Sequence, residues 1–289
     1  MNFMKTNDTV DFICAGAQKS GTTTLYGLLS QHPDVCLPKQ KELYFFCDYK
    51  IYKKGYGWYE EQFACDGLRG DITPDYMLFP ECAERIFKYN KNLKLLFILR
   101  NPADRAFSHY QMKKRDTEER MTFKDALEAE NGRTSRGYRQ RMKYSYMERG
   151  YYNRLLLPYY KFYSEDSIKV LLFEDFINDI DGSMREIEKF LGLSPYKGYI
   201  LPERRNEGYL PKRRSFAYIK RHFLRPVRGI YNTVLPEGLR KKISSATEAG
   251  YLPKENMPDE IRVQLVEEYL EDIKKLENLL NRDLSVWYN

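Results

Sequence analysis

The chain has 289 residues, 42% of them hydrophobic and 31% charged, so it is long and apolar enough to form one large folded domain. Its formal net charge is +7, and no run of about twenty apolar residues predicts a transmembrane helix. Residues 1–9 are polar and lack the apolar stretch of a signal peptide. Three histidines, and five cysteines without a Cys-x-x-Cys pair, argue against a structural zinc site. Together these features favour a reduced, cytoplasmic protein without a metal.

The predicted strands and helices alternate along the chain. Apolar runs bounded by turn residues predict strands near 10–16, 69–72, 94–99 and 168–173. Helical periodicity predicts helices near 22–31, 80–90, 102–115, 122–131, 146–163, 180–191 and 259–280. The basic segment 132–145 is rich in turn residues and is predicted to be a mobile loop. The alternation indicates an α/β fold with a central parallel sheet covered by helices on both faces.

A turn rich in glycine and threonine, Gly16-Ala-Gln-Lys-Ser-Gly-Thr-Thr23, joins the first predicted strand to the first helix. Helix N-termini bind anions, and this turn adds hydroxyl groups and one lysine. In the nucleoside-triphosphate loop a lysine follows the second glycine, but here Thr22 stands there and the lysine is Lys19. This order resembles the 5′-phosphosulfate loop of sulfotransferases that use 3′-phosphoadenosine 5′-phosphosulfate (PAPS). The resemblance implies that the 5′-phosphate is bound by Gln18, Lys19, Ser20, Gly21, Thr22 and Thr23.

A second motif, Lys41-Glu-Leu-Tyr-Phe-Phe46, follows a His-Pro-Asp-Val segment soon after the first helix. It resembles the heparan-sulfate and related carbohydrate sulfotransferases, in which the matching glutamate is the proposed general base. The resemblance implies that Glu42 takes the proton from an acceptor hydroxyl, which needs a positioned base. Phe45 and Phe46 are then expected to form an apolar wall. The alternative is a surface glutamate on a charged loop.

A third motif begins where the predicted strand 94–99 ends at Arg100. Pro102 suits the first turn of the next helix, which places Ser108 about two turns along it. Ligands of open α/β sheets bind outside the carboxyl ends of the strands. The Arg-x7-Ser spacing resembles the 3′-phosphate site of PAPS-dependent sulfotransferases, so it implies that Arg100 and Ser108 bind that phosphate. The alternative is an arginine that caps a strand and a serine that faces solvent.

The chain departs from the heparan-type pattern on the acceptor side. Those enzymes carry a lysine before a Thr-Pro pair, where this chain has Ile72, so a second active-site lysine is absent or comes from elsewhere. The histidine often found two residues after the base is replaced by Tyr44. Sulfotransferases of small phenols and steroids use a histidine base. Neither His32 nor His109 lies in that family's histidine context, which favours Glu42 as the base.

The positive charge is concentrated in residues 203–228, which carry nine lysines and arginines against two glutamates. A basic lid over the nucleotide, a membrane-surface helix and a nucleic-acid patch are competing interpretations. The family resemblance favours a lid at about 200–230, with Lys212, Arg213 and Arg214 as candidate cofactor contacts. A solvated charged face is the remaining alternative.

The motifs together predict one sulfotransferase domain over residues 1–289, with the helix at 259–280 packing against it. The resemblance implies transfer of a sulfuryl group from PAPS to a hydroxyl, less favourably an amine, of a carbohydrate or small natural product. No nucleic-acid partner is expected, and weak association with a membrane surface stays open. An unanchored chain resembles a bacterial member of the family, although a trimmed lumenal domain is an alternative. Two other functions are a P-loop kinase of small molecules and a non-enzymatic basic module that binds nucleic acid or glycans.

Overall fold

The computed structural model describes residues 9–200, 210–211, 251–252 and 255–288. The chain divides into two compact units, the first made of residues 1–106, 147–203 and 263–289 and the second of residues 107–146 and 204–262. Lys212, Arg213 and Arg214, the predicted lid contacts, lie outside the described residues. In the described part of the chain, no helix is both long enough and apolar enough to cross a membrane.

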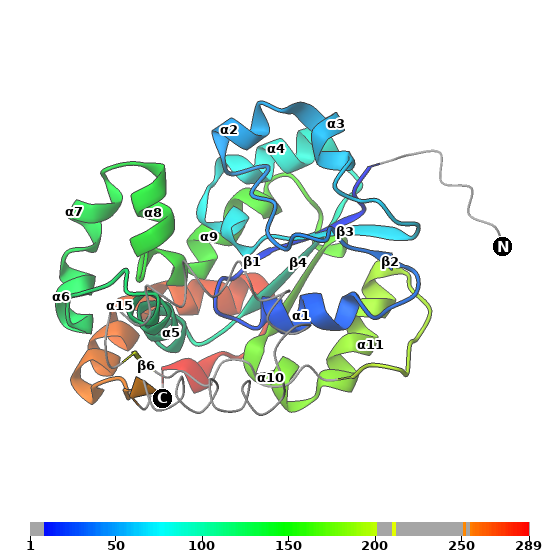
Figure 1. Ribbon diagram of the computed structural model, residues 1–289. Coiled ribbons are helices and arrows are strands. Elements are labelled where there is room, and N and C mark those ends of the chain that lie inside the picture. The colour runs from blue at the N-terminus through cyan, green and yellow to red at the C-terminus, as the bar shows by residue number, and fades with distance from the viewer. Residues whose placement is uncertain (1–8, 201–209, 212–250, 253–254, 289) are drawn as a thin grey trace, which may run out of the picture. The chain divides into compact units, whose positions relative to one another are not determined.

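A five-stranded parallel sheet forms the centre of the first unit (Figure 1). Its strands are, in spatial order, β2 (Val35–Cys36), β3 (Leu68–Ile72), β1 (Phe12–Gly16), β4 (Lys94–Leu99) and β5 (Ile168–Leu172). Phe12 of β1 pairs with Gly70 on one side and with Lys94 on the other. The sequence predicts all of these strands except β2, because two residues are too few to show a period. The predicted α/β fold with a central parallel sheet is confirmed.

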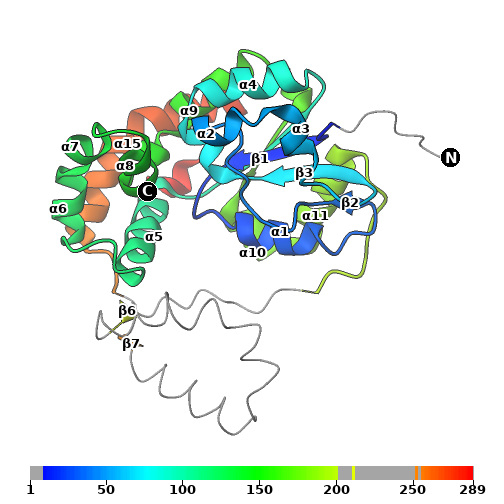
Figure 2. The same cartoon turned by 45° about the horizontal axis from the view of Figure 1, so that its top comes forward.

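Helices cover both faces of this sheet (Figures 1 and 2). One face carries α1 (Thr22–Leu29), α10 (Phe173–Asn178) and α11 (Ile180–Leu191), and the other carries α4 (Glu81–Tyr89) and α9 (Tyr152–Tyr160). The short helices α2 (Tyr49–Tyr52) and α3 (Gly55–Glu60) precede β3. The last helix, α15, runs from Asp259 to Leu280, which is the span that its apolar stripe predicts.

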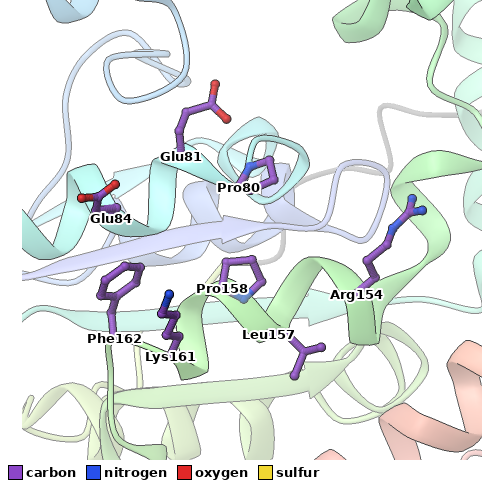
Figure 3. Close-up of a pocket in the computed structure, with 8 residues that line it drawn as sticks. All are labelled: Pro80, Glu81, Glu84, Arg154, Leu157, Pro158, Lys161 and Phe162. Atoms are coloured by element: carbon purple, nitrogen blue, oxygen red, sulfur yellow. The ribbon is translucent and has the colours of Figure 1, made fainter.

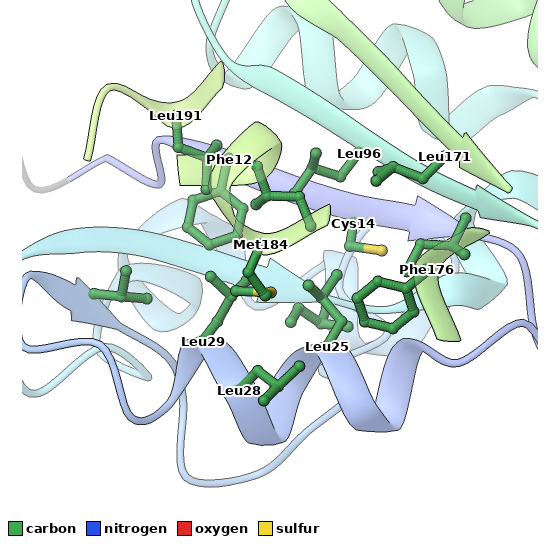
Figure 4. Close-up of a cluster of buried hydrophobic side chains, with 14 residues drawn as sticks. Phe12, Cys14, Leu25, Leu28, Leu29, Leu96, Leu171, Phe176, Met184 and Leu191 are labelled. Carbon is green, nitrogen blue, oxygen red and sulfur yellow. The ribbon is translucent and has the colours of Figure 1, made fainter. Parts of the chain in front are cut away.

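Alternating side chains of the strands build the core under α1 and α11 (Figure 4). Phe12 and Cys14 of β1 point to this face, because successive strand residues point to opposite sides. They meet apolar residues of the flanking helices: Leu25, Leu28, Leu29, Phe176, Met184, Ile187 and Leu191. Full burial of each such large apolar side chain contributes about 1.5–3 kcal/mol, so this face fixes α1 and the loop before it on the sheet.

The second unit contains most of α5 (Pro102–Arg115) and the helices α6 (Phe123–Glu128), α7 (Glu130–Thr134) and α8 (Tyr138–Tyr144). It also contains an antiparallel pair of two-residue strands, β6 (Leu210–Pro211) and β7 (Tyr251–Leu252). The prediction of a loop over 132–145 is wrong, since α7 and α8 fill most of it. The turn residues of that segment gather between the two helices, where Gly137 has a φ of 115°.

The helix predicted over 146–163 begins later, at Tyr152. A short 3-10 turn, Glu148–Gly150, comes first. A Cβ atom at Gly150 would lie 2.6 Å from the ring of Tyr269 in α15, so the chain passes close to that side chain here. The 3-10 turn, packed against Tyr269, therefore stands where the first turn of the helix was expected.

Cys36 and Cys65 form a disulfide, with their Cα atoms 5.6 Å apart. This bond corrects the interpretation of all the cysteines as reduced. Cys36 ends β2 and Cys65 precedes β3, so the pairing of these two strands brings together cysteines that are 29 positions apart. The disulfide joins the two ends of residues 37–64, the segment that carries Glu42, α2 and α3.

Candidate functional site

The loop between β1 and α1 has the backbone of an anion-binding site. Gly21 is the N-cap residue of α1, with a φ of 85°, and no side chain caps the helix there. The first N–H groups of α1 therefore have no acceptor within the helix and point out of its N-terminus. A Cβ atom at Gly21 would lie 3.1 Å from the ring of Phe173, and one at Gly16 would lie 2.4 Å from the sulfur of Met77. Close packing thus requires glycine at both positions, and the positive φ of Gly21 favours glycine there as well.

Two side chains of this loop fit an anionic phosphate. The hydroxyl of Ser20 is fully buried and makes no hydrogen bond of normal geometry to any other described residue. A buried hydroxyl without a well-formed hydrogen bond costs free energy, which a bound phosphate oxygen would offset. Lys19 has a φ of 73°, a conformation that is uncommon outside glycine and is concentrated at functional sites. The residues predicted to hold the 5′-phosphate therefore fit that group.

Arg100 follows β4 and lies beside this loop. Its Nη1 donates a hydrogen bond to the carbonyl oxygen of Lys19 at 3.4 Å, and its guanidinium carbon lies 4.8 Å from the centre of the Phe173 ring. The Tyr152 hydroxyl donates to the Arg100 carbonyl at 2.8 Å. Burial raises the pKa of Tyr152 to about 12, so the hydroxyl keeps its proton at neutral pH. The structure thus brings two predicted motifs together at Arg100 and Lys19. It also places Tyr152 and Phe173 on Arg100, and neither of these was predicted as a site residue.

Ser108 lies about two turns into α5 and is half buried. Asn101 caps this helix, because its side-chain oxygen accepts two backbone N–H groups of the first turn at 3.0 and 3.2 Å. Pro102 occupies the first helical position, as predicted. Ser108 belongs to the second unit, which begins at Phe107, whereas Arg100 belongs to the first. Joint binding of a 3′-phosphate by the two residues stays a prediction.

The carboxylate of Glu42 is held by its two polar neighbours. Its Oε1 forms a short ion pair with the ammonium of Lys41, and its Oε2 accepts a hydrogen bond from the Tyr44 hydroxyl at 2.5 Å. The side chain of Glu42 is 28% exposed, so it remains open to solvent. Glu42 and Tyr44 have φ values of 68° and 55°, again in the left-handed region. The sequence predicts no role for Tyr44 and shows only that it replaces a histidine often found at this position.

Hydrogen bonds anchor the Glu42 loop to the sheet. The backbone N–H of Leu43 donates to the hydroxyl of Thr73 at 3.0 Å. The backbone N–H of Thr73 donates in turn to the carbonyl of Cys14 in β1 at 3.1 Å. Glu42 is therefore tied to the strand whose carboxyl end leads into the loop around Lys19.

Asp71, at the end of β3, holds the Thr73 hydroxyl to which the Glu42 loop is anchored. It is completely buried and accepts hydrogen bonds from the hydroxyls of Thr73, Tyr76 and Tyr59 at 2.7, 2.7 and 2.9 Å. Burial raises the pKa of Asp71, although these three donors oppose the shift. One buried carboxyl group thus fixes the hydroxyl that holds the Glu42 loop.

Phe45 and Phe46 do not form the expected apolar wall. Both side chains are fully buried. Phe45 stacks on Tyr59 with ring centres 4.5 Å apart, and Phe46 meets the same ring edge-on at 5.1 Å. They belong to an aromatic core under α2 and α3, where each aromatic contact adds about 0.5–1.5 kcal/mol to the burial of its area.

A separate open pocket of about 510 Å³ lies on the first unit, at α4 and α9 (Figure 3). Its lining mixes apolar and charged side chains: Pro80, Glu81, Glu84, Arg154, Leu157, Pro158, Lys161 and Phe162. None of the predicted site residues is among them. We therefore place the candidate site at the carboxyl ends of β1, β3 and β4 instead.

Comparison with known proteins identifies the family. The model of the sulfotransferase domain matches residues 9–207, well over half of the chain. The chain belongs to the sulfotransferase domain family. The predicted resemblance is confirmed by a relative named heparan sulfate glucosamine 3-O-sulfotransferase 5 from Mus musculus, 28% identical over 188 residues. The membrane-associated sulfotransferase kil1 of Dictyostelium discoideum is 38% identical over 106 residues.

These alignments differ in how much they cover. The mouse match covers 63% of this chain and 53% of that sulfotransferase, and the Dictyostelium match covers 35% and 22%. The chain thus spans about half of one curated relative and a fifth of the other. A crystal structure of a sulfotransferase from Alicyclobacillus acidocaldarius is 26% identical, with a TM-score of 0.69, and covers 97% of this chain and 99% of its own. This likeness supports the sulfotransferase fold for the part of the chain that the structure describes.

Proposed function

We propose that this sulfotransferase moves the sulfuryl group of PAPS to a hydroxyl, less favourably an amine, of a carbohydrate or small natural-product acceptor. One observation carries the proposal: the side chain of Arg100 bonds to the backbone of Lys19, so two anion-binding motifs meet at one edge of the sheet. PAPS is a nucleotide with an anionic group at both its 3′ and its 5′ position. Paired anion sites suit such a molecule better than they suit a nucleoside triphosphate, whose charges form one chain.

Each binding motif has a separate task in this reaction. The loop from Gln18 to Thr23 holds the 5′-phosphate, and Arg100 with Ser108 holds the 3′-phosphate and so fixes the register of the nucleotide. Lys19 stabilises negative charge that develops next to the 5′-phosphate during transfer. We keep Lys212, Arg213 and Arg214 as candidates for a basic lid. Residues 1–289 then act as one sulfotransferase domain.

The transfer step exchanges one sulfur–oxygen bond for another. The acceptor oxygen bonds to sulfur while the bond from sulfur to the bridging oxygen of the 5′-phosphate breaks. The electron pair of the broken bond leaves on that oxygen, as part of 3′-phosphoadenosine 5′-phosphate (PAP). Glu42 receives the proton of the acceptor hydroxyl on a carboxylate oxygen.

The relatives bear on the acceptor, and the disulfide bears on the compartment. The heparan-sulfate relatives support a glycan as acceptor, and a small natural product stays the second candidate. The sequence favours a cytoplasmic protein, but disulfides persist mainly in oxidising compartments. The disulfide between Cys36 and Cys65 therefore supports a periplasmic, lumenal or extracellular location over the cytoplasm.

Glu42→Gln tests the proposed reaction. With radiolabelled PAPS, and with desulfated heparan sulfate and 4-nitrophenol as probe acceptors, we expect the wild type to label at least one of them. The variant keeps the shape of the side chain but cannot take a proton, so transfer should fall by about 10²–10⁴-fold. Binding of PAP, measured by calorimetry, should not change. Full transfer by the variant would remove Glu42 as the base, and failure of the wild type to label either probe would contradict the acceptor classes.

A further inference from the structure

The Glu42 carboxylate is clamped by the residues on either side of it in the chain. Lys41 contacts Oε1 and Tyr44 donates to Oε2, so each oxygen has its own partner. An ionised carboxylate offers about four lone-pair positions. Two contacts therefore leave about two positions open, enough to accept the proton of a substrate while both oxygens stay fixed.

The backbone prepares the Tyr44 contact. Glu42 and Tyr44 both have left-handed φ values, while the N–H of Leu43 between them is tied to Thr73. With these two uncommon conformations around one anchored residue, the side chains of Glu42 and Tyr44 meet in a hydrogen bond. Strain of this kind persists where the surrounding structure demands it, and it is concentrated at functional sites.

Tyr44 is also suited to remain a donor. Burial is the main cause that raises the pKa of its phenol above the usual value, and the nearby carboxylates of Asp75 and Glu42 raise it further. The hydroxyl therefore keeps its proton at neutral pH and is available as a donor. In the structure it donates to Glu42.

We propose that Tyr44 is the positioning residue of the base: its hydroxyl holds the Glu42 carboxylate in the orientation that takes the acceptor proton. This role rests on the proposed function of Glu42. It assigns to a tyrosine hydroxyl the place where the heparan-type pattern often has a histidine. Tyr44 contacts Glu42, and the proposal assigns it no contact with the substrate.

Tyr44→Phe removes the hydroxyl and keeps the ring. A hydrogen bond to a charged group is worth about ten- to a hundred-fold, so kcat should fall by that factor, with little change in the KM for PAPS or in PAP affinity. Tyr44→His restores a donor, and histidine tolerates positive φ better than most residues, so it should recover much of the loss. Tyr52→Phe is the matched control, since Tyr52 lies on the same segment and its hydroxyl forms a long hydrogen bond with Tyr56, away from Glu42.

A double-mutant cycle separates positioning from a structural role. If Tyr44 acts through Glu42, then Tyr44→Phe should cost nothing further in a Glu42→Gln background. An equal loss in both backgrounds, or a Tyr44→Phe variant as active as Tyr52→Phe, would overturn the inference while leaving Glu42 as the base. Full transfer by Glu42→Gln would overturn the base and the inference together. A large fall in the unfolding temperature of Tyr44→Phe that histidine does not restore would assign Tyr44 to packing and overturn the inference.

Discussion

Left-handed backbone marks the residues to which we assign the chemistry. Lys19, Glu42 and Tyr44 are three of the five non-glycine residues with positive φ in the described part of the chain. Each such conformation costs about 1–3 kcal/mol and persists only where the surroundings fix it. Their concentration in two loops at one edge of the sheet supports a functional assignment for both loops.

Lys19→Ala tests the electrostatic role of the lysine. Because its charge is assigned to the transition state more than to the bound nucleotide, kcat should fall by about 10²–10³-fold, while the Kd for PAP changes far less. Single-turnover transfer and calorimetry measure the two quantities. Lys39→Ala removes an exposed lysine elsewhere and serves as the control. Equal losses in turnover and in affinity would contradict the role.

At the scale of elements, the end of β3 joins the base loop to the sheet. The hydroxyl of Thr73 accepts from Leu43 and donates to Asp71, so one buried carboxyl group supports the loop through a single residue. A buried, hydrogen-bonded network of this kind rigidifies the groups attached to it. This support has a cost, because burial of the Asp71 carboxyl group opposes its ionisation.

That cost predicts a pH dependence. The pKa of Asp71 is raised in the folded protein, so between about pH 4 and that raised value the folded state binds more protons than the unfolded state. Stability from this group is therefore complete at low pH and is lost as the pH rises. Denaturant titrations should show the unfolding free energy of the wild type decreasing relative to that of Asp71→Asn across this window. If the unfolding free energy of the wild type stayed constant or rose relative to that of Asp71→Asn, the raised pKa of Asp71 would be contradicted.

The elements that the sequence predicts well are those with a strong period. The apolar stripe of α15 and the continuous apolar run of β4 identify both elements at their observed boundaries. The helices α2 and α8 are missed because they are short and none of their residues is buried, so they show no apolar stripe. The strand β2 is held by its pairing with β3, a long-range contact that no local pattern records.

In the whole molecule, the sequence predicts features with a local pattern. It does not predict which residues far apart in the chain become neighbours in the fold. The motifs identify Lys19, Glu42 and Arg100 one by one, since each has a local pattern. The bond from Arg100 to the Lys19 backbone and the disulfide between Cys36 and Cys65 depend on which strands are neighbours. The burial of Phe45 and Phe46 is missed for the same reason.

If the proposed function holds, this chain binds a nucleotide with separate 3′ and 5′ anionic groups. Thermal unfolding with PAP, compared with ADP and with ATP plus magnesium, measures this preference. A ligand at 100 times its Kd stabilises the fold by about 2.7 kcal/mol. We predict a clear rise in Tm with PAP and a much smaller one with the other two nucleotides. A larger rise with ATP and magnesium would favour a kinase, and no rise with any nucleotide would contradict the assigned roles of Lys19 and Arg100.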